Sequence, residues 1–238
     1  MPLAEHFARQ ECEFSRCYSS MIYEQLAISY LARSKKQAKC TEIILDQVAS
    51  YEESGEADAQ TVFSAALHIN MLSHDVMALL LLHSITDDKW TNRTAARMIA
   101  TVIYEGARDL QQIFGKPFRD ACNALGILQS IECELARVKK ELAAFQRTHE
   151  SVLKPIRMVA GAHRDHEITT FLGVFIEESK STAVIAAAAD LEKCLRSWGE
   201  FSTDVMKLTR GAVKQNTSKA SKAPAPDGSS SATSRSSS

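Results

Sequence analysis

Glycine and proline are scarce in this sequence, with 9 and 5 residues among 238. Aromatic residues make up 7%, and runs of β-branched residues are few. A sheet protein needs glycine and proline in its turns, and aromatic and β-branched residues in its strands. Alanine, leucine, glutamate, lysine and arginine are common instead, and these residues favour long helices. We therefore predict an all-α fold, an antiparallel helical bundle.

Long hydrophobic runs are also absent. The longest, Val76 to Leu82 and Thr182 to Ala189, are shorter than the about 20 apolar residues that a membrane-spanning helix needs. The start, Met1-Pro2-Leu3-Ala4-Glu5-His6, lacks the basic and then apolar regions of a secretory signal. We expect a cytoplasmic protein with no membrane partner.

The six cysteines form no Cys-x-x-Cys pair and no other zinc spacing. Most lie inside helical patterns, so in a reducing compartment we expect small buried apolar side chains, with Cys12 and Cys17 as the exceptions. His163-x-x-His166-Glu167 carries metal-compatible side chains, but it is not the His-Glu-x-x-His order and has no evident third ligand. We predict no metal site and no cofactor.

The charge is close to balanced, at −1, and the segment from Gly211 onward carries four cations and one anion. The remainder is therefore mildly acidic, which argues against broad binding to nucleic acid. Between Arg137 and Arg164 the balance reverses, with seven cations against Glu141 and Glu150. This local excess of +5 indicates where an anionic ligand would bind.

Hydrophobic spacing divides the chain into three parts. An N-terminal extension, 1–56, is predicted to contain helices over 5–34 and 41–51, separated after Ser34-Lys35-Lys36. A bundle, 57–212, is predicted to contain helices over 58–85, from the Thr86–Thr91 linker to 113, from Pro117 through Val152, and over 180–208. The Ser, Ala, Pro and Gly residues of 213–238 predict a disordered tail.

The third bundle helix carries a heptad-like seam of apolar residues that includes His149. We interpret this seam as one edge of an antiparallel bundle in preference to an independent coiled coil, because it lasts only three to four heptads. His149 is then expected to be a core or boundary residue whose ring is hydrogen-bonded, in preference to a ligand.

Functional side chains concentrate in 153–167, between two long helical segments. Pro155 suits the first turn of a new helix, and Gly161 lies where that turn could loosen. Arg157 and His163 are six residues apart, which in an unbroken helix separates them by about 240° and about 9 Å along the axis. Their meeting requires a break at Gly161 or a second copy of the chain.

This arrangement resembles the HEPN superfamily, whose motif is an arginine followed after four to six residues by a histidine. The stretch from Ile156 through Arg157 and His163 to Asp165 looks especially like the AbiU2-like branch, and the resemblance covers about residues 58 to 210. It implies a helical bundle that dimerises so that two motifs line one cleft. Many members are metal-independent ribonucleases of toxin–antitoxin or phage-defence systems, and others are noncatalytic binding modules.

The motif supplies the groups that RNA cleavage needs without a metal. Histidine, with a pKa near 6.5, serves as base or acid, and a guanidinium matches phosphate oxygens. We therefore expect Arg157 and His163 to be catalytic, Arg164 and Lys154 to bind the RNA substrate, and Asp165 or His166 to orient the imidazole. The partners implied are a second copy, RNA and an antitoxin protein.

Two alternatives remain open. Met158 follows the motif arginine where the family usually has a polar residue, often asparagine, and this favours a noncatalytic protein-interaction or RNA-binding module. Arg157 and His163 could instead have a structural role, capping helix ends where the chain turns.

His163-Arg164-Asp165 also matches a kinase triplet, but the glycine-rich loop and the other kinase motifs are absent.

Overall fold

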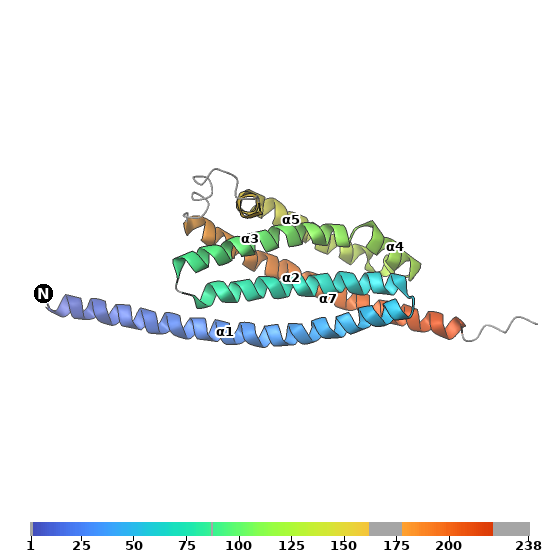
Figure 1. The fold of residues 1–238 in the computed structure, drawn as a ribbon, viewed down its shortest axis with the longest axis horizontal. Helices are drawn as coiled ribbons and strands as arrows, with labels where there is room; N and C mark the ends of the chain where they lie inside the picture. Colours follow the sequence, from blue (N-terminus) through green and yellow to red (C-terminus); the bar gives the residue numbers. More distant parts are fainter. Residues whose placement is uncertain (1, 87, 162–177, 221–238) are drawn as a thin grey trace, which may run out of the picture.

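The computed structural model describes residues 2–86, 88–161 and 178–220, and over these ranges the chain is helical with no strand. The helices are α1 (Pro2–Glu53), α2 (Ala57–Ile85), α3 (Lys89–Ile113), α4 (Lys116–Ala124), α5 (Leu128–Gly161) and α7 (Glu178–Ala220). Figure 1 shows α2, α3, α5 and α7 forming a bundle, with α1 lying along α2 and projecting past it toward the N-terminus. The all-α bundle expected from composition is confirmed.

Helix α1 is continuous where the sequence predicts a break after Ser34-Lys35-Lys36. That prediction is wrong because the basic residues there are not a helix end. Arg33 Nη2 lies 2.7 Å from Glu192 Oε2 of α7, and Gln37 Nε2 donates to the Asn70 carbonyl of α2 at 2.9 Å. These tertiary contacts span the expected break, and no glycine or proline lies within it.

The helix predicted from Pro117 through Val152 is two helices, α4 and α5. Gly126 separates them with φ +71°, in the left-handed region that favours glycine. The Gly126 N–H donates to the Asn123 carbonyl and the Ile127 N–H to the Cys122 carbonyl, both at 2.9 Å, which satisfies carbonyls at the end of α4. The chain therefore turns before α5 begins.

Helix α5 passes through Pro155 and ends at Gly161, whereas the sequence predicts that Pro155 opens a new helix. A proline inside a helix removes one backbone hydrogen bond, at a cost of about 3 kcal/mol. Leu153 and Ile156 on either side are both buried in the core, and their burial offsets that cost. The tertiary packing of this segment thus outweighs its local preference.

An aromatic cluster forms the centre of the core. The Phe114 ring lies 4.6 Å from Phe118 and 4.5 Å from Trp198, measured between centroids, and Trp198 meets Phe201 edge-on at 5.9 Å. The rings join α4 and α7 to the turn after α3.

Helix α7 continues to Ala220, past the start of the expected tail at 213, and residues 221–238 lie outside the described ranges.

The cysteine prediction is confirmed in part. Cys122 is buried, and burial raises the pKa of its thiol to about 12. Cys40 and Cys133 are exposed, so for these two the prediction is wrong. Both residues lie at outward-facing helix positions, and the apolar pattern of the sequence did not distinguish these positions from buried ones. The side chains of Cys12 and Cys17 lie outside the described residues.

His149 is a boundary residue, as its place on the α5 seam predicts. Its side chain is mostly buried, its ring centroid lies 5.0 Å from that of Phe145, and its Nε2 lies 3.2 Å from Asp190 Oδ2 of α7. The Lys193 ammonium hydrogen-bonds the same carboxyl, and with the His149 ring it lowers the pKa of Asp190. His149 thus joins α5 to α7.

Candidate functional site

Arg157 lies near the C-terminal end of α5, on the side that faces α3. The buried side chains of Leu153 and Ile156 fix the rotation of the helix here. The Arg157 Nε donates to Glu105 Oε1 of α3, and the arginine side chain remains 39% exposed. Met158 is 55% exposed. The motif arginine is therefore held by a carboxylate from another helix and still reaches solvent.

Glu105 also faces a second arginine. Arg108 Nη1 lies 3.8 Å from Glu105 Oε2, and the Arg108 guanidinium lies over the Tyr104 ring, 5.9 Å from its centroid. We call Arg157, Glu105 and Arg108 the arginine cluster. Two guanidinium groups share one carboxylate in it, so the cluster keeps a net charge of +1. This residual charge can attract a phosphate.

A hollow of about 250 Å³ lies beside the cluster, between α3 and α5. Arg108 belongs both to the arginine cluster and to the lining of this hollow. Lys154 is not part of the lining, but its Nζ lies 3.2 Å from Oε1 of Glu150, which is. The Gln111 and Gln146 side chains hydrogen-bond each other across the two helices. The lining is Tyr104, Ala107, Arg108, Gln111, Phe145, Gln146, Glu150 and Leu153. It combines aromatic surface, amides and charge.

Of the residues that the sequence places in the site, Lys154 and Arg157 are described. They lie about one turn apart on α5, but Lys154 pairs with Glu150 and Arg157 pairs with Glu105. His163, Arg164, Asp165 and His166 lie outside the described residues, so the meeting of Arg157 with His163 stays a prediction. Glu105 and Arg108 were missed, since their spacing on α3 indicates only an ordinary helical ion pair.

The local charge excess from Arg137 to Arg164 is smaller than the sequence count suggests. Arg137 contacts both Glu134 and Glu141 on its own helix, and Glu134 lies just before the counted range. Lys139 Nζ donates to the Phe114 carbonyl at 3.2 Å. Arg137 is therefore neutralised on its own helix, and Lys139 is held at the end of α3. Of the other described cations in this range, Lys140, Arg147, Lys154 and Arg157, only Arg157 belongs to the arginine cluster.

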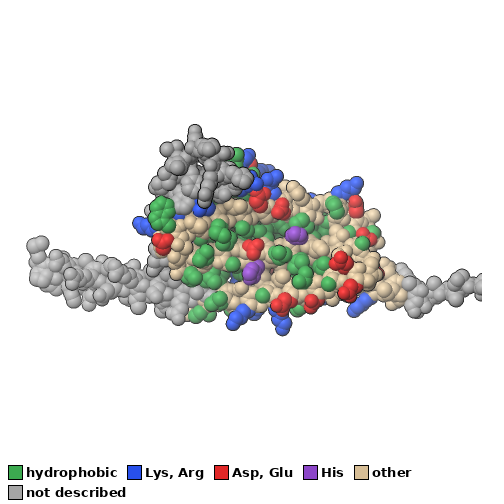
Figure 2. All heavy atoms as spheres, in the orientation of Figure 1, with side chains coloured by type: hydrophobic (Ala, Val, Ile, Leu, Met, Phe, Trp, Pro, Cys, Tyr) green, Lys and Arg blue, Asp and Glu red, His purple; other side chains and the backbone are tan. Residues whose placement is uncertain are grey.

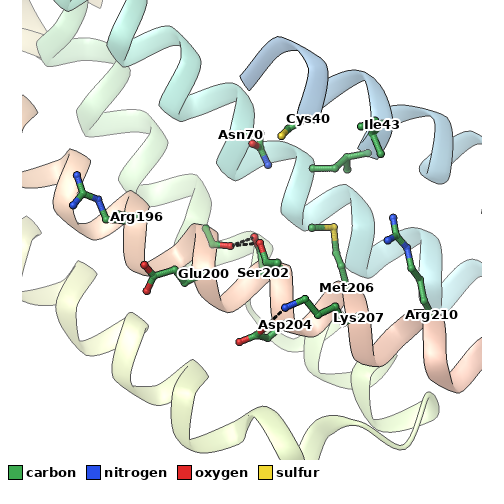
Figure 3. A pocket seen from close by; sticks show the side chains of 13 residues that line it. Cys40, Ile43, Asn70, Arg196, Glu200, Ser202, Asp204, Met206, Lys207 and Arg210 are labelled. Carbon is green, nitrogen blue, oxygen red and sulfur yellow. Dashed lines mark hydrogen bonds and ion pairs between the residues drawn. The ribbon is translucent and has the colours of Figure 1, made fainter. Parts of the chain in front are cut away.

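A larger hollow, of about 660 Å³, lies elsewhere in the described part, between α1, α2 and α7 (Figure 3). Three cations line it, Arg196, Lys207 and Arg210, and two of them are already engaged: Lys207 pairs with Asp204 at 2.9 Å, and Arg210 lies over the Phe63 ring at 5.4 Å. No member of the arginine cluster lines it, whereas Arg108 lines the α3–α5 hollow. We therefore assign the candidate site to the α3–α5 hollow.

Within the described ranges, no group of three His, Cys, Asp or Glu side chains is placed to hold a metal ion. No protein-family model matches the chain, and no match is found among curated proteins or solved structures. The residues of the site and the motif therefore carry the evidence for a function.

Proposed function

We propose that this chain is a HEPN-type protein directed at RNA, a metal-independent endoribonuclease of a toxin–antitoxin or phage-defence system that acts as a cytoplasmic homodimer. The observation that supports it is the arginine cluster. Arg157 is positioned by Glu105 and accompanied by Arg108, so that a net positive charge stands six residues before the motif histidine. Such a site suits a phosphodiester in a solvent-accessible groove.

Glu105 has a positioning role in this proposal. A long arginine side chain on a surface samples many rotamers, and fixing it costs entropy when substrate binds. The bond from Arg157 Nε to Glu105 meets that cost in the folded protein and holds the arginine side chain against α3. Arg108 supplies again the positive charge that the Glu105 carboxylate neutralises on Arg157.

The proposed reaction needs no group beyond the chain and the RNA. The 2′-oxygen attacks the adjacent phosphorus while His163 of one copy accepts its proton, and the bond from phosphorus to the 5′-oxygen breaks. A second imidazole, His163 of the other copy, donates a proton to the departing oxygen. Arg157 stabilises the negative charge that develops on the phosphorane oxygens. The products are a 2′,3′-cyclic phosphate and a 5′-hydroxyl.

The neighbouring residues contact RNA beyond the scissile bond. Lys154 and Arg164 bind flanking phosphates, and Asp165 or His166 orients the imidazole. The hollow beside the arginine cluster offers the Tyr104 ring for stacking and the Gln111 and Gln146 amides for base edges. These are the contacts by which proteins recognise unpaired RNA bases. The substrate class we propose is therefore single-stranded RNA.

The test is cleavage of mixed RNA in chelator by the wild type and by His163→Ala and Arg157→Ala. Arg137→Ala is the matched control, because Arg137 is also an ion-paired arginine of α5 but lies away from the hollow. We expect each motif variant to lose at least about 100-fold in rate, with Arg137→Ala close to wild type. Cleavage that survives His163→Ala would exclude the proposed chemistry.

A noncatalytic module is the second candidate. Its support is specific: the exposed Met158 stands where the family usually has a polar residue, and Glu105 already occupies the Arg157 Nε. In that case the wild type binds single-stranded RNA or a protein partner in the same groove without cutting RNA. Loss of RNA binding in Arg157→Ala, with no cleavage by the wild type, would establish this function in place of the first.

A further inference from the structure

Helix α2 carries an exposed stripe with coiled-coil spacing. The stripe alternates steps of three and four residues, and all of its members are exposed: His68, Met71, Asp75, Ala78, Leu82 and Ile85. Met71 is 50% exposed and Ile85 60%. Figure 2 shows hydrophobic side chains gathered on the face over α2 and α3. Alternating three and four is the spacing at which a helix presents one seam to a partner.

The rest of α2 is already covered. α1, α3 and α7 all pack against this helix, and they bury residues such as Phe63, Val76 and Met77. By length and composition α2 alone, among the described helices, could cross a membrane, a test that core helices also pass. Yet only 33% of its most apolar window is buried. The stripe is the side of an apolar helix that the bundle leaves open.

The open face extends onto α3. Met98 is exposed there, and a shallow hollow of about 250 Å³ between α2 and α3 includes Met71 and Val102 in its lining. The stripe is about 27 Å long, and two helices are about 20 Å wide. Two such faces together bury on the order of 1,000 Å², which is the threshold for a specific interface.

We propose that this face binds the same face of a second copy, with the two α2 helices antiparallel and the two-fold axis near Ala78. Ala78 is the smallest side chain of the stripe and lies close to its centre, so the helices can approach closely there. The antiparallel arrangement brings Met71 opposite the partner's Ile85. Large apolar residues at the two ends of the stripe then cover each other.

Charge selects the antiparallel arrangement. In a parallel pair each Asp75 would lie directly against its own copy, which places like charges opposite each other in a desolvated seam. In the antiparallel pair the two Asp75 positions are separated by six residues, about 9 Å along the axis. Asp75, Glu105 and Asp109 also border the hollow beside Met71, and these acidic groups do not suit an anionic membrane surface.

This inference adds to the homodimer of the proposed function the surface through which the two copies meet, and the interface itself does not require RNA cleavage. Glu105, which holds Arg157, lines the same α2–α3 hollow, so the arginine cluster lies at the edge of the interface. Cleavage assays and assembly assays use separate readouts. A dimer without nuclease activity refutes the proposed function alone, and an active dimer that Leu82→Glu leaves intact refutes the interface alone.

The test is sedimentation of the full chain over a range of concentrations. We expect the wild type to form a dimer and Leu82→Glu to be monomeric with an unchanged circular-dichroism spectrum. Leu208→Glu is the matched control, because Leu208 of α7 and Leu82 are both 39% exposed. It should remain dimeric. A monomeric wild type, or equal dissociation by both variants, overturns the proposal, as does flotation of a monomeric wild type with anionic lipid vesicles.

Cysteine cross-linking tests the arrangement independently of any loss of folding. In a background in which the native cysteines other than the buried Cys122 are serine, Ala78→Cys should form a disulfide-linked dimer under mild oxidation. Met71→Cys should not, because antiparallel helices hold the two positions about 21 Å apart along the axis. Efficient linking through Met71→Cys indicates a parallel pair and contradicts the antiparallel assignment.

Discussion

Arg157 and Glu105 are 52 residues apart in the sequence and form an ion pair between α5 and α3. The pair joins the helix that carries the motif arginine to the helix that carries Arg108 and Tyr104. The pair therefore links the two helices that border the α3–α5 groove, and the proposed function depends on this link. Because both side chains are partly exposed, we expect its effect on stability to be small and its effect on activity to be large.

The coupling within this pair can be measured with a double-mutant cycle. Glu105→Gln and Arg157→Met should each lower the free energy of unfolding, and the cycle should give a coupling energy of about 0.5 to 1 kcal/mol. Urea unfolding of the four proteins provides the values. The same cycle for Lys154 and Glu150, an exposed pair four residues apart, is the control and should give about 0.3 kcal/mol. Additive effects at Arg157 and Glu105 would show that the side chains do not interact in solution.

Gly126 should be intolerant of a side chain for conformational reasons alone. A Cβ at this position meets nothing within 4 Å, but φ is +71°, so Gly126→Ala should lose about 1 kcal/mol of unfolding free energy. Gly211 also has open space around a Cβ, yet it lies within α7. Gly211→Ala should therefore stabilise the protein by about 0.5 to 1 kcal/mol. Equal effects of the two substitutions would contradict the turn between α4 and α5.

His83 should make stability depend on pH. Burial lowers the pKa of its imidazole, so between the folded and unfolded pKa values the unfolded chain binds more protons. Its contribution is then greatest above about pH 6.5 and falls as the pH decreases through the folded pKa. Lys89 and Arg93 of α3 line the same hollow and add positive charge near the ring.

The measurement is urea unfolding from pH 7.5 to 5 for the wild type and His83→Gln. The substitution should flatten the decrease in stability across this range. If His83→Gln and the wild type have the same slope, the imidazole is not buried as the structure places it.

Local signals predicted the element boundaries well where one residue decides them. The sequence predicted a helix from the Thr86–Thr91 linker to 113, and α3 spans Lys89–Ile113. Asp88 accepts a hydrogen bond from the Thr91 N–H at 2.7 Å at the start of this helix. The boundaries that failed depend on tertiary contacts. Arg33 and Gln37 are held by α7 and α2 across the expected break in α1, and Pro155 is held within α5 by its buried neighbours.

The site was predictable only along one helix. Lys154 and Arg157 were found because they share the motif segment, but the sequence count overstated the charge around them, since Arg137 pairs with Glu134 and Glu141. Which carboxylate meets each cation was not predictable, because Glu105 comes from α3. Sequence spacing reports neighbours within an element, whereas the arginine cluster is created by the packing of two elements. The same limit applies to the α2 stripe, whose exposure appears only after α1, α3 and α7 are in place.

The chemistry of the RNA ends is the most direct test of the central claim, that Arg157 and His163 cut RNA without a metal. A defined single-stranded RNA is incubated with the full chain in excess chelator, and the product ends are identified by mass spectrometry. The account predicts 2′,3′-cyclic phosphate and 5′-hydroxyl ends that disappear in His163→Ala. Intact RNA, or 5′-phosphate ends that require a divalent cation, would contradict it.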